Sequence, residues 1–312
     1  MELETNLDKL FLVQNEELKN TAYNDKIDYN APEWKELYEY ERKQSLIPPS
    51  PNNPPWNSWI AIVLWIFSVL LIIFLPFLFV IPYAASQNIN LADAQMLADF
   101  LKNSPTAILL NVIAIFPAHF FTLLVAWFVV TKNKTYSFRQ TLGWSSGNFR
   151  WFYYILILVG FFAIAGVVNY LMPNKGNELE RILQSSRTAV FIVAFLATFT
   201  APLVEEVIYR GILYSAFQRS IGRAGAVVIV TALFALVHVP QYWGSPGTIF
   251  LICLLSLVLT LVRVKSDNLL PCVILHTIFN GLQSLFLVLE PYLPKDLKPL
   301  EEQAAAILHI FK

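Results

Sequence analysis

The stretch TAPLVEEVIYRG, residues 200–211, places three formal charges, Glu205, Glu206 and Arg210, inside an apolar run from 188 to 217. The other long apolar runs between residues 56 and 289 have uncharged interiors. An ionisable side chain at membrane depth costs roughly 3 kcal/mol or more, so such residues are rare and usually functional. The run therefore indicates a membrane protein and marks where its function is to be sought.

The composition supports this interpretation. Of the 312 residues, 56% are hydrophobic and only 14% are charged, whereas soluble proteins contain about 25% charged residues. A formal net charge of +0 argues against a nucleic-acid partner, which would need a basic face. We expect no disulfide, because Cys253 and Cys272 both lie in or beside apolar runs. The N-terminus lacks the pattern of a signal peptide, so the first membrane segment would serve as its own insertion signal.

The chain falls into four predicted regions. Residues 1–55 form an acidic polar tail and a proline-rich linker, in which residues 47–56 read IPPSPNNPPW. Prolines at this density predict a stiff, extended segment that is not an element of the fold. We predict three accessory transmembrane helices in 56–187, a catalytic core in 188–289 and a C-terminal tail in 290–312.

The apolar runs predict an all-α, polytopic transmembrane helix bundle, because a spanning helix needs roughly 20 apolar residues. We expect seven spans, four of them forming the core in the C-terminal half, and an eighth stays open as an alternative. A short surface helix is expected within 85–104. The predicted spans are 59–82, 106–131, 151–172, 188–217, 222–239, 247–264 and 269–289.

The span 188–217 admits two interpretations. At 1.5 Å per residue it would measure about 45 Å, which exceeds a hydrocarbon core of about 30 Å. Pro202 lacks an amide donor and predicts a kink or a break. We prefer one bent helix to two short ones, because seven spans with the N-terminus inside put most Lys and Arg residues on the cytoplasmic side.

The three charges have different predicted roles. Glu206 and Arg210 are four residues apart with the acid first, which favours an ion pair on one helix face. Glu205 is rotated by about 100° to a neighbouring face and has no obvious local partner. A buried carboxylate without a partner is suited to exchange a proton, as a general base must. The alternative is a purely structural cluster that clamps helices together.

Other polar side chains are expected at a similar depth. His238 ends the fifth run, and His276 and Asn280 are four residues apart in the last run, so they share a helix face. Polar groups at this depth must turn towards each other or towards water. His119 stands alone in the second span, and we interpret it as a packing residue.

The chemistry that this set predicts is hydrolysis. Glu205 would take a proton from water, one histidine would hold that water, and the other histidine with Asn280 would stabilise the oxyanion. His238 and His276 with one glutamate could also bind a divalent metal such as zinc. However, the sequence contains no His-Glu-x-x-His motif. We favour Glu205 as a base and leave the metal open.

Three motifs, Glu205-Glu206-x-x-x-Arg210, Phe234-x-x-x-His238 and His276-x-x-x-Asn280, resemble those of the CAAX prenyl protease and bacteriocin-processing family of intramembrane endopeptidases. They occur in the family's order within roughly the last third of the chain. The resemblance implies a membrane-embedded enzyme in which Glu205 activates water and His238, His276 and Asn280 complete the site. It implies a lipidated, CAAX-like or leader peptide as substrate, and it leaves metal dependence unsettled.

Two other functions compete with a protease. One is a proton-coupled transporter that uses the acid and the histidines as a relay, although no repeated half is visible. The other is a non-catalytic binding or immunity protein. No span contains Gly-x-Ser-Gly or an aspartate, so serine and aspartyl intramembrane proteases are set aside. We expect a multi-pass protein of a bacterial cytoplasmic membrane, with a membrane protein or a lipidated peptide as its partner.

Overall fold

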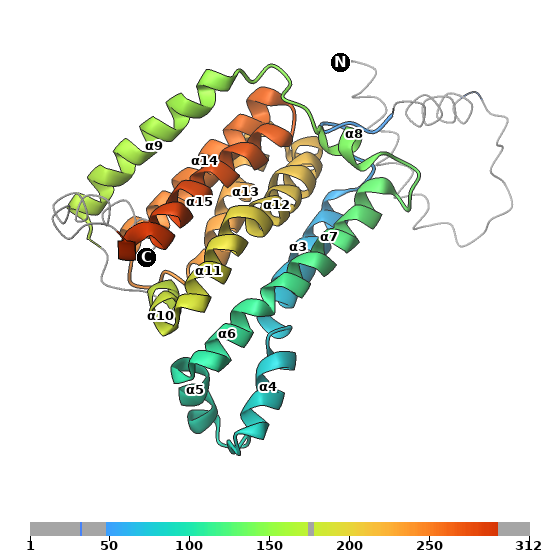
Figure 1. Ribbon diagram of the computed structural model, residues 1–312. Helices are drawn as coiled ribbons and strands as arrows, with labels where there is room; N and C mark the ends of the chain where they lie inside the picture. Colours follow the sequence, from blue (N-terminus) through green and yellow to red (C-terminus); the bar gives the residue numbers. More distant parts are fainter. Residues whose placement is uncertain (1–31, 33–47, 174–177, 293–312) are drawn as a thin grey trace, which may run out of the picture. The chain divides into compact units, whose positions relative to one another are not determined.

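The computed structural model describes Pro32, residues 48–173 and residues 178–292 (Figure 1). The chain divides into two units, Met1–Pro48 and Pro49–Lys312, and nearly all the described residues belong to the second. The predicted tails therefore lie largely outside the described residues. All the secondary-structure elements named in those residues are helices, which confirms the all-α class.

The helices follow one another in chain order with short connections. They are α3 (Ser58–Phe74), α4 (Phe77–Ser86), α5 (Ala94–Asn103), α6 (Pro105–Ile113), α7 (Ile115–Thr131), α8 (Phe138–Leu142), α9 (Trp151–Leu171), α10 (Glu178–Ser185), α11 (Arg187–Phe195), α12 (Ala201–Glu206), α13 (Tyr214–His238), α14 (Pro246–Ser266) and α15 (Leu270–Leu289). Two π-helical segments, η1 (Leu196–Thr200) and η2 (Val207–Leu213), flank α12, and a 3-10 turn, η3 (Glu290–Tyr292), follows α15.

Six helical segments within the described residues are long and apolar enough to cross a membrane. The protein is therefore an integral, multi-pass membrane protein. The six segments are Ser58–Ser86, Pro105–Thr131, Trp151–Leu171, Arg187–His238, Pro246–Ser266 and Leu270–Leu289.

The fourth segment, Arg187–His238, has 52 residues and reverses direction inside its length. A straight helix of this size would measure about 78 Å. Gly222 interrupts it with φ 78° and ψ 167°, a conformation that a residue with a side chain rarely adopts. Beyond this point the chain returns along itself, so that the Phe234 ring lies 5.0 Å from the Tyr209 ring. The two arms correspond to the predicted spans 188–217 and 222–239, but the total of seven spans stays a prediction.

Local sequence signals explain where several helices begin. The side chains of Asn57, Asp93, Ser104 and Ser186 each accept a hydrogen bond from a backbone N–H in the first turn of the helix that follows. Such caps satisfy amide groups that have no partner within the helix. The helix α5 corresponds to the surface helix predicted within 85–104, and none of its side chains is buried.

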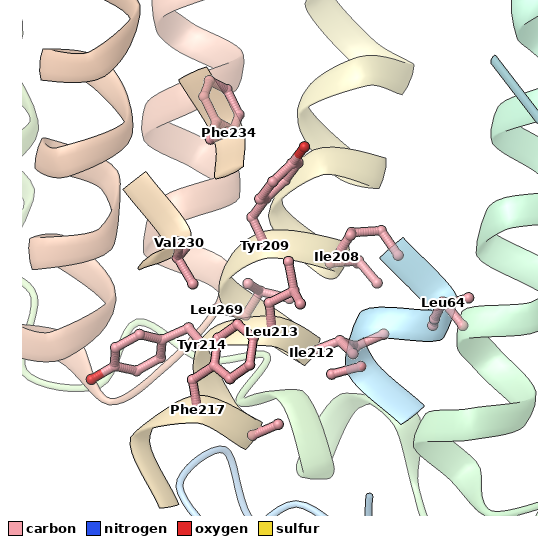
Figure 2. Close-up of a cluster of buried hydrophobic side chains, with 14 of the residues drawn as sticks. Leu64, Ile208, Tyr209, Ile212, Leu213, Tyr214, Phe217, Val230, Phe234 and Leu269 are labelled. Atoms are coloured by element: carbon pink, nitrogen blue, oxygen red, sulfur yellow. The ribbon is translucent and has the colours of Figure 1, made fainter. Parts of the chain in front are cut away.

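The helices around the charged stretch share one buried core (Figure 2). In Figure 2, side chains of η2, including Ile208, Ile212 and Leu213, lie among residues of α3 and α13 such as Leu64 and Phe217. The helix α3 packs against η2 and α7, and α13 packs against η2 and α14. The segment η2, which directly follows Glu206, thus packs against the accessory helix α3 as well as against α13.

The end of the proline-rich segment belongs to the fold, which differs from the prediction of a linker outside it. The Trp56 indole is 3% exposed and donates a hydrogen bond to the Ile212 carbonyl at 3.1 Å. Arg263 donates to the Pro51 carbonyl at 2.6 Å, and Arg219 donates to the Pro54 carbonyl at 2.8 Å. Because proline cannot donate from its own nitrogen, this segment is held through backbone carbonyl groups and through the side chains of Asn52 and Trp56. Composition alone did not reveal these contacts.

Pro202 does not break the helix. The chain widens into η1 just before it, where the Ala201 amide bonds to the Leu196 carbonyl five residues back. A π-turn gives room for a residue that cannot continue the α-helical hydrogen bonds, and such turns are frequent at functional sites. A second widening, η2, begins directly after Glu206. The preference for one continuous helix is confirmed, and the two π-segments are a feature that the sequence did not predict.

Candidate active site

A buried ion pair lies at the centre of the charged stretch. Arg210 Nη1 lies 2.9 Å from Glu206 Oε1, and both side chains have no exposed surface. This confirms the pairing predicted from their spacing of four residues. The second oxygen, Glu206 Oε2, is buried without a hydrogen-bond partner. A carboxylate this deep depends on its cation, because an unpaired buried charge is costly.

The helix α14 supplies the remaining partners of Arg210. Arg210 Nη2 donates to both the carbonyl and the hydroxyl of Ser256 at 2.9 Å, and Nε donates to the Thr260 hydroxyl at 3.3 Å. Arg210 thus joins two helices through a planar set of donors. Neither Ser256 nor Thr260 was predicted. Their spacing of four residues within an apolar run was the available signal, because it puts both on one helix face.

His276 lies between the two glutamates. Its Nδ1 is 2.7 Å from Glu206 Oε1, and its Nε2 is 3.8 Å from Glu205 Oε2. Because Glu206 is already paired with Arg210, its carboxylate accepts and the histidine Nδ1 donates. The Nε2 atom is therefore the ring nitrogen that faces Glu205. The distance of 3.8 Å exceeds that of a direct hydrogen bond.

The two glutamates differ in environment as well as in partner. The Glu205 side chain is 24% exposed, whereas that of Glu206 is fully buried. The described residues contain no other ion pair that involves Glu205 besides its approach to His276. The predicted division between a structural Glu206 and a less constrained Glu205 agrees with this geometry.

His238 is connected to the other proposed site residues by the ring of Phe234. The His238 Nδ1 lies 2.7 Å from the Phe234 carbonyl oxygen, and the two rings lie 4.7 Å apart. The Phe234 ring is also 6.2 Å from the His276 ring and 4.8 Å from the Arg210 guanidinium carbon. This phenylalanine therefore contacts both histidines, and the Nδ1 contact directs the remaining nitrogen of His238, Nε2, away from the backbone.

Asn280 is held by the opposite helix. Its side-chain amide donates to the Ala197 carbonyl at 2.8 Å. That carbonyl lies five residues before Pro202, which has no N–H to complete the π-helical pattern. Asn280 thus supplies the donor that Pro202 lacks, and one hydrogen of its amide remains for another acceptor. Its helix face is that of His276, as predicted, but no hydrogen bond joins it to the other proposed site residues in the described part of the chain.

His238 and His276 were also predicted as ligands of a divalent metal. A catalytic zinc site takes three protein ligands, whereas no group of three or more His, Cys, Asp or Glu residues within 48–173 and 178–292 is arranged to hold a metal ion. His238 and His276 each have Nδ1 engaged, as metal-binding histidines do, but a third ligand does not join them. The predicted metal role of these two residues therefore has no support in the geometry.

Two further polar residues, His119 and Tyr242, lie outside the predicted set of catalytic residues. His119 is 6% exposed and hydrogen-bonds through Nδ1 to the Thr200 hydroxyl at 2.9 Å, which agrees with its interpretation as a packing residue. Tyr242, in the turn after α13, was not predicted. Burial raises the pKa of its hydroxyl, and the negative charge of Glu205 raises it further.

One comparison with known proteins gives a match. Residues 187–282 match a family model described as type II CAAX prenyl endopeptidase Rce1-like. The matched segment begins with α11, ends within α15 and contains Glu205, His238, His276 and Asn280. The resemblance predicted from the three motifs is confirmed for this segment, and at the level of the family it indicates a membrane-embedded protease. No curated protein and no solved structure matched the chain.

Proposed function

We propose that this protein is an intramembrane endopeptidase that hydrolyses a peptide bond of a membrane-associated substrate with water activated by Glu205. The observation that carries the proposal is the approach of Glu205 Oε2 to His276 Nε2 at 3.8 Å, beside a fully buried Glu206–Arg210 pair. A partly exposed carboxylate beside an imidazole in a membrane-spanning helix is suited to general base catalysis. The similarity of residues 187–282 to CAAX prenyl endopeptidases supports the same reaction.

The reaction needs one proton to be moved twice. Glu205 takes a proton from water, and the water oxygen attacks the carbonyl carbon of the scissile bond. The C–N bond then breaks, and the proton passes from Glu205 to the leaving amine. Glu205 acts first as a base and then as an acid, and the second transfer returns it to the ionised state in which it began.

The other residues have assigned roles in this proposal. His238 helps to hold the attacking water through its Nε2. Asn280 donates to the developing oxyanion, and His276 donates to it through Nε2 in the imidazolium form, in which both ring nitrogens carry a hydrogen. Preorganised donors contribute most to the rate at this point. The Asn280 amide has one hydrogen that is not engaged with Ala197, and His276 is kept in position at Nδ1 by Glu206. We propose no metal in these steps, because the donor set does not supply three ligands.

The substrate class follows from the membrane. A site on transmembrane helices reaches peptides that are anchored in the bilayer, and we propose a lipidated, CAAX-like or leader peptide, or a transmembrane protein, as the substrate. We propose a bacterial cytoplasmic membrane as the location. Neither of the competing functions, a proton-coupled transporter or a non-catalytic immunity protein, predicts hydrolysis of a peptide.

The test uses the full chain in liposomes with a panel of membrane-anchored reporter peptides, and mass spectrometry identifies any new termini. The proposal predicts cleavage at one defined bond. Proton flux without cleavage would indicate the transporter, and binding without cleavage or flux would indicate the immunity protein. Either of these results would overturn the proposal.

A further inference from the structure

Two hydroxyl groups lie on one face of α14, at Ser256 and Thr260. Both residues have no exposed surface, although α14 is an apolar helix long enough to cross a membrane. A buried hydroxyl needs a hydrogen-bond partner, because leaving it without one costs free energy. The reaction described above gives neither residue a role, so their partners indicate what they do.

Both hydroxyls face the guanidinium of Arg210. The Ser256 hydroxyl oxygen accepts from Nη2 at 2.9 Å, and the Thr260 hydroxyl oxygen accepts from Nε at 3.3 Å. The Thr260 hydroxyl donates its own hydrogen to the Ser256 carbonyl at 2.7 Å, and that carbonyl also accepts from Nη2. The two residues thus form one connected set of acceptors that holds two of the three guanidinium nitrogens.

The third nitrogen of Arg210 extends these hydrogen bonds to the proposed reaction site. Its Nη1 lies 2.9 Å from Glu206 Oε1, and the same oxygen lies 2.7 Å from His276 Nδ1. Each contact from α14 to the imidazole is therefore within or close to ordinary hydrogen-bond distance. The three side chains are at most 3% exposed, so water competes little with these bonds.

The Glu206 carboxylate can fix the imidazole only if the carboxylate itself is fixed. Its other oxygen, Oε2, has no hydrogen-bond partner among the described residues, so its orientation is set at Oε1. If the Arg210 guanidinium moves, Oε1 moves with it, and the His276 Nδ1–H is separated from its acceptor. Small displacements of a catalytic group lower the rate strongly.

We propose that Ser256 and Thr260 are positioning residues for His276. By holding the Arg210 guanidinium, they keep the Glu206 carboxylate in the orientation that fixes the imidazole. This inference rests on the proposed role of His276 in the reaction. It gives α14 a part in arranging the site, although this helix carries none of the four predicted catalytic residues. The helix packs against both α13 and α15, which carry the two histidines of the site.

The test compares Ser256→Ala, Thr260→Val and the double variant with the wild type. The double variant should lower kcat about tenfold or more, because it removes two hydrogen bonds from a charged group, and each single variant should lower it less. KM should change little, because neither side chain contacts the substrate in this account. Thr260→Ser keeps the hydroxyl and should therefore keep the wild-type kcat.

Ser266→Ala is the matched control on the same helix. It also removes a buried serine hydroxyl, but this hydroxyl donates to the Asn268 carbonyl at 2.9 Å, in the turn after α14. It should lower the thermal stability and keep the wild-type kcat, which separates positioning from a loss of stability. A wild-type kcat in the double variant, or an equal loss of kcat in Ser266→Ala, would overturn the inference.

Nitrogen NMR of the protein with isotope-labelled histidine gives a readout that does not depend on cleavage. The Nδ1 resonance of His276, assigned by its absence in His276→Gln and recorded at alkaline pH, should have the shift of a protonated nitrogen in the wild type. In the double variant it should move towards the shift of an unprotonated nitrogen, because the displaced imidazole exchanges between its two tautomers.

The two readouts separate this inference from the proposed function. An unchanged Nδ1 resonance in the double variant would overturn the positioning role even if no substrate is cleaved. A resonance that moves as expected, in a protein whose wild type cleaves no reporter, would support the positioning role and count against the proposed function alone.

Discussion

The Nδ1 atom of His276 lies 2.7 Å from Oε1 of Glu206, the same oxygen that lies 2.9 Å from Arg210 Nη1. One buried carboxylate oxygen thus fixes a cation on its own helix and an imidazole on α15. In consequence the orientation of His276, and with it the approach of Nε2 to Glu205, depends on the neighbouring glutamate.

Glu206→Ala should destabilise the protein strongly. The substitution leaves Arg210 buried without its counter-charge, and breaking a buried pair costs about 3–5 kcal/mol. The loss of stability is measured by unfolding the protein in detergent with heat or with denaturant. Glu178→Ala, which removes the exposed partner of Arg181, is the matched control, and it should cost about 1 kcal/mol or less. Equal stability of the two variants would contradict the structural role of Glu206.

Asn280→Ala should reduce both stability and cleavage, and the two effects should be separable. The Ala197 carbonyl is part-buried and loses its donor, which costs about 1 kcal/mol. Adding Pro202→Ala restores a backbone N–H near that carbonyl. The double variant should therefore regain much of its thermal stability while its cleavage rate remains low, because the oxyanion donor is still absent. Recovery of the cleavage rate in the double variant would refute a catalytic role for Asn280.

Much of this fold could be predicted from the sequence. The apolar runs gave the helices, and the spacing of Glu206 and Arg210 gave their ion pair. The family resemblance followed from three motifs and agrees with the segment that matches. These features depend on helix periodicity, which can be predicted from the spacing of residues that are close together in the chain.

Other features depend on contacts between residues far apart in the chain. The hydrogen bonds of residues 51–56 to Ile212, Arg219 and Arg263 could not be predicted, because each partner lies more than 150 positions away. The same holds for the hydrogen bond that the Trp65 indole of α3 donates to the Tyr209 hydroxyl oxygen of η2 at 3.0 Å. The replacement of the missing Pro202 donor by Asn280 required the partner helix to be known. Composition described residues 47–56 correctly as proline-rich but gave no information on what they contact.

The packing of the proline-rich segment gives a further prediction. Trp56 is 3% exposed, so Trp56→Ala should lower the free energy of unfolding by about 3–5 kcal/mol, the usual cost of removing a buried aromatic ring. Trp59→Ala is the comparison, because Trp59 is 76% exposed. Denaturant unfolding of both variants in the same detergent tests this. A smaller loss for Trp56 than for Trp59 would show that the segment does not stabilise the fold.

Removal of metal ions should leave the cleavage rate unchanged. No three side chains of the described residues are arranged as metal ligands, and a catalytic zinc would need three. The measurement is the initial rate after prolonged treatment with a chelator such as 1,10-phenanthroline, followed by dialysis. Loss of activity that is restored by added zinc and by no other treatment would contradict a metal-free mechanism.

The role of Glu205 is tested most directly by the single-turnover rate of reporter cleavage in Glu205→Gln, measured beside the wild type in the same liposomes. Glutamine keeps the size of the side chain but cannot accept the proton from water. The rate should fall by about 10²-fold or more, the usual contribution of a general base, while the melting temperature stays the same. Cleavage by Glu205→Gln at the wild-type rate would show that this carboxylate does not activate the water.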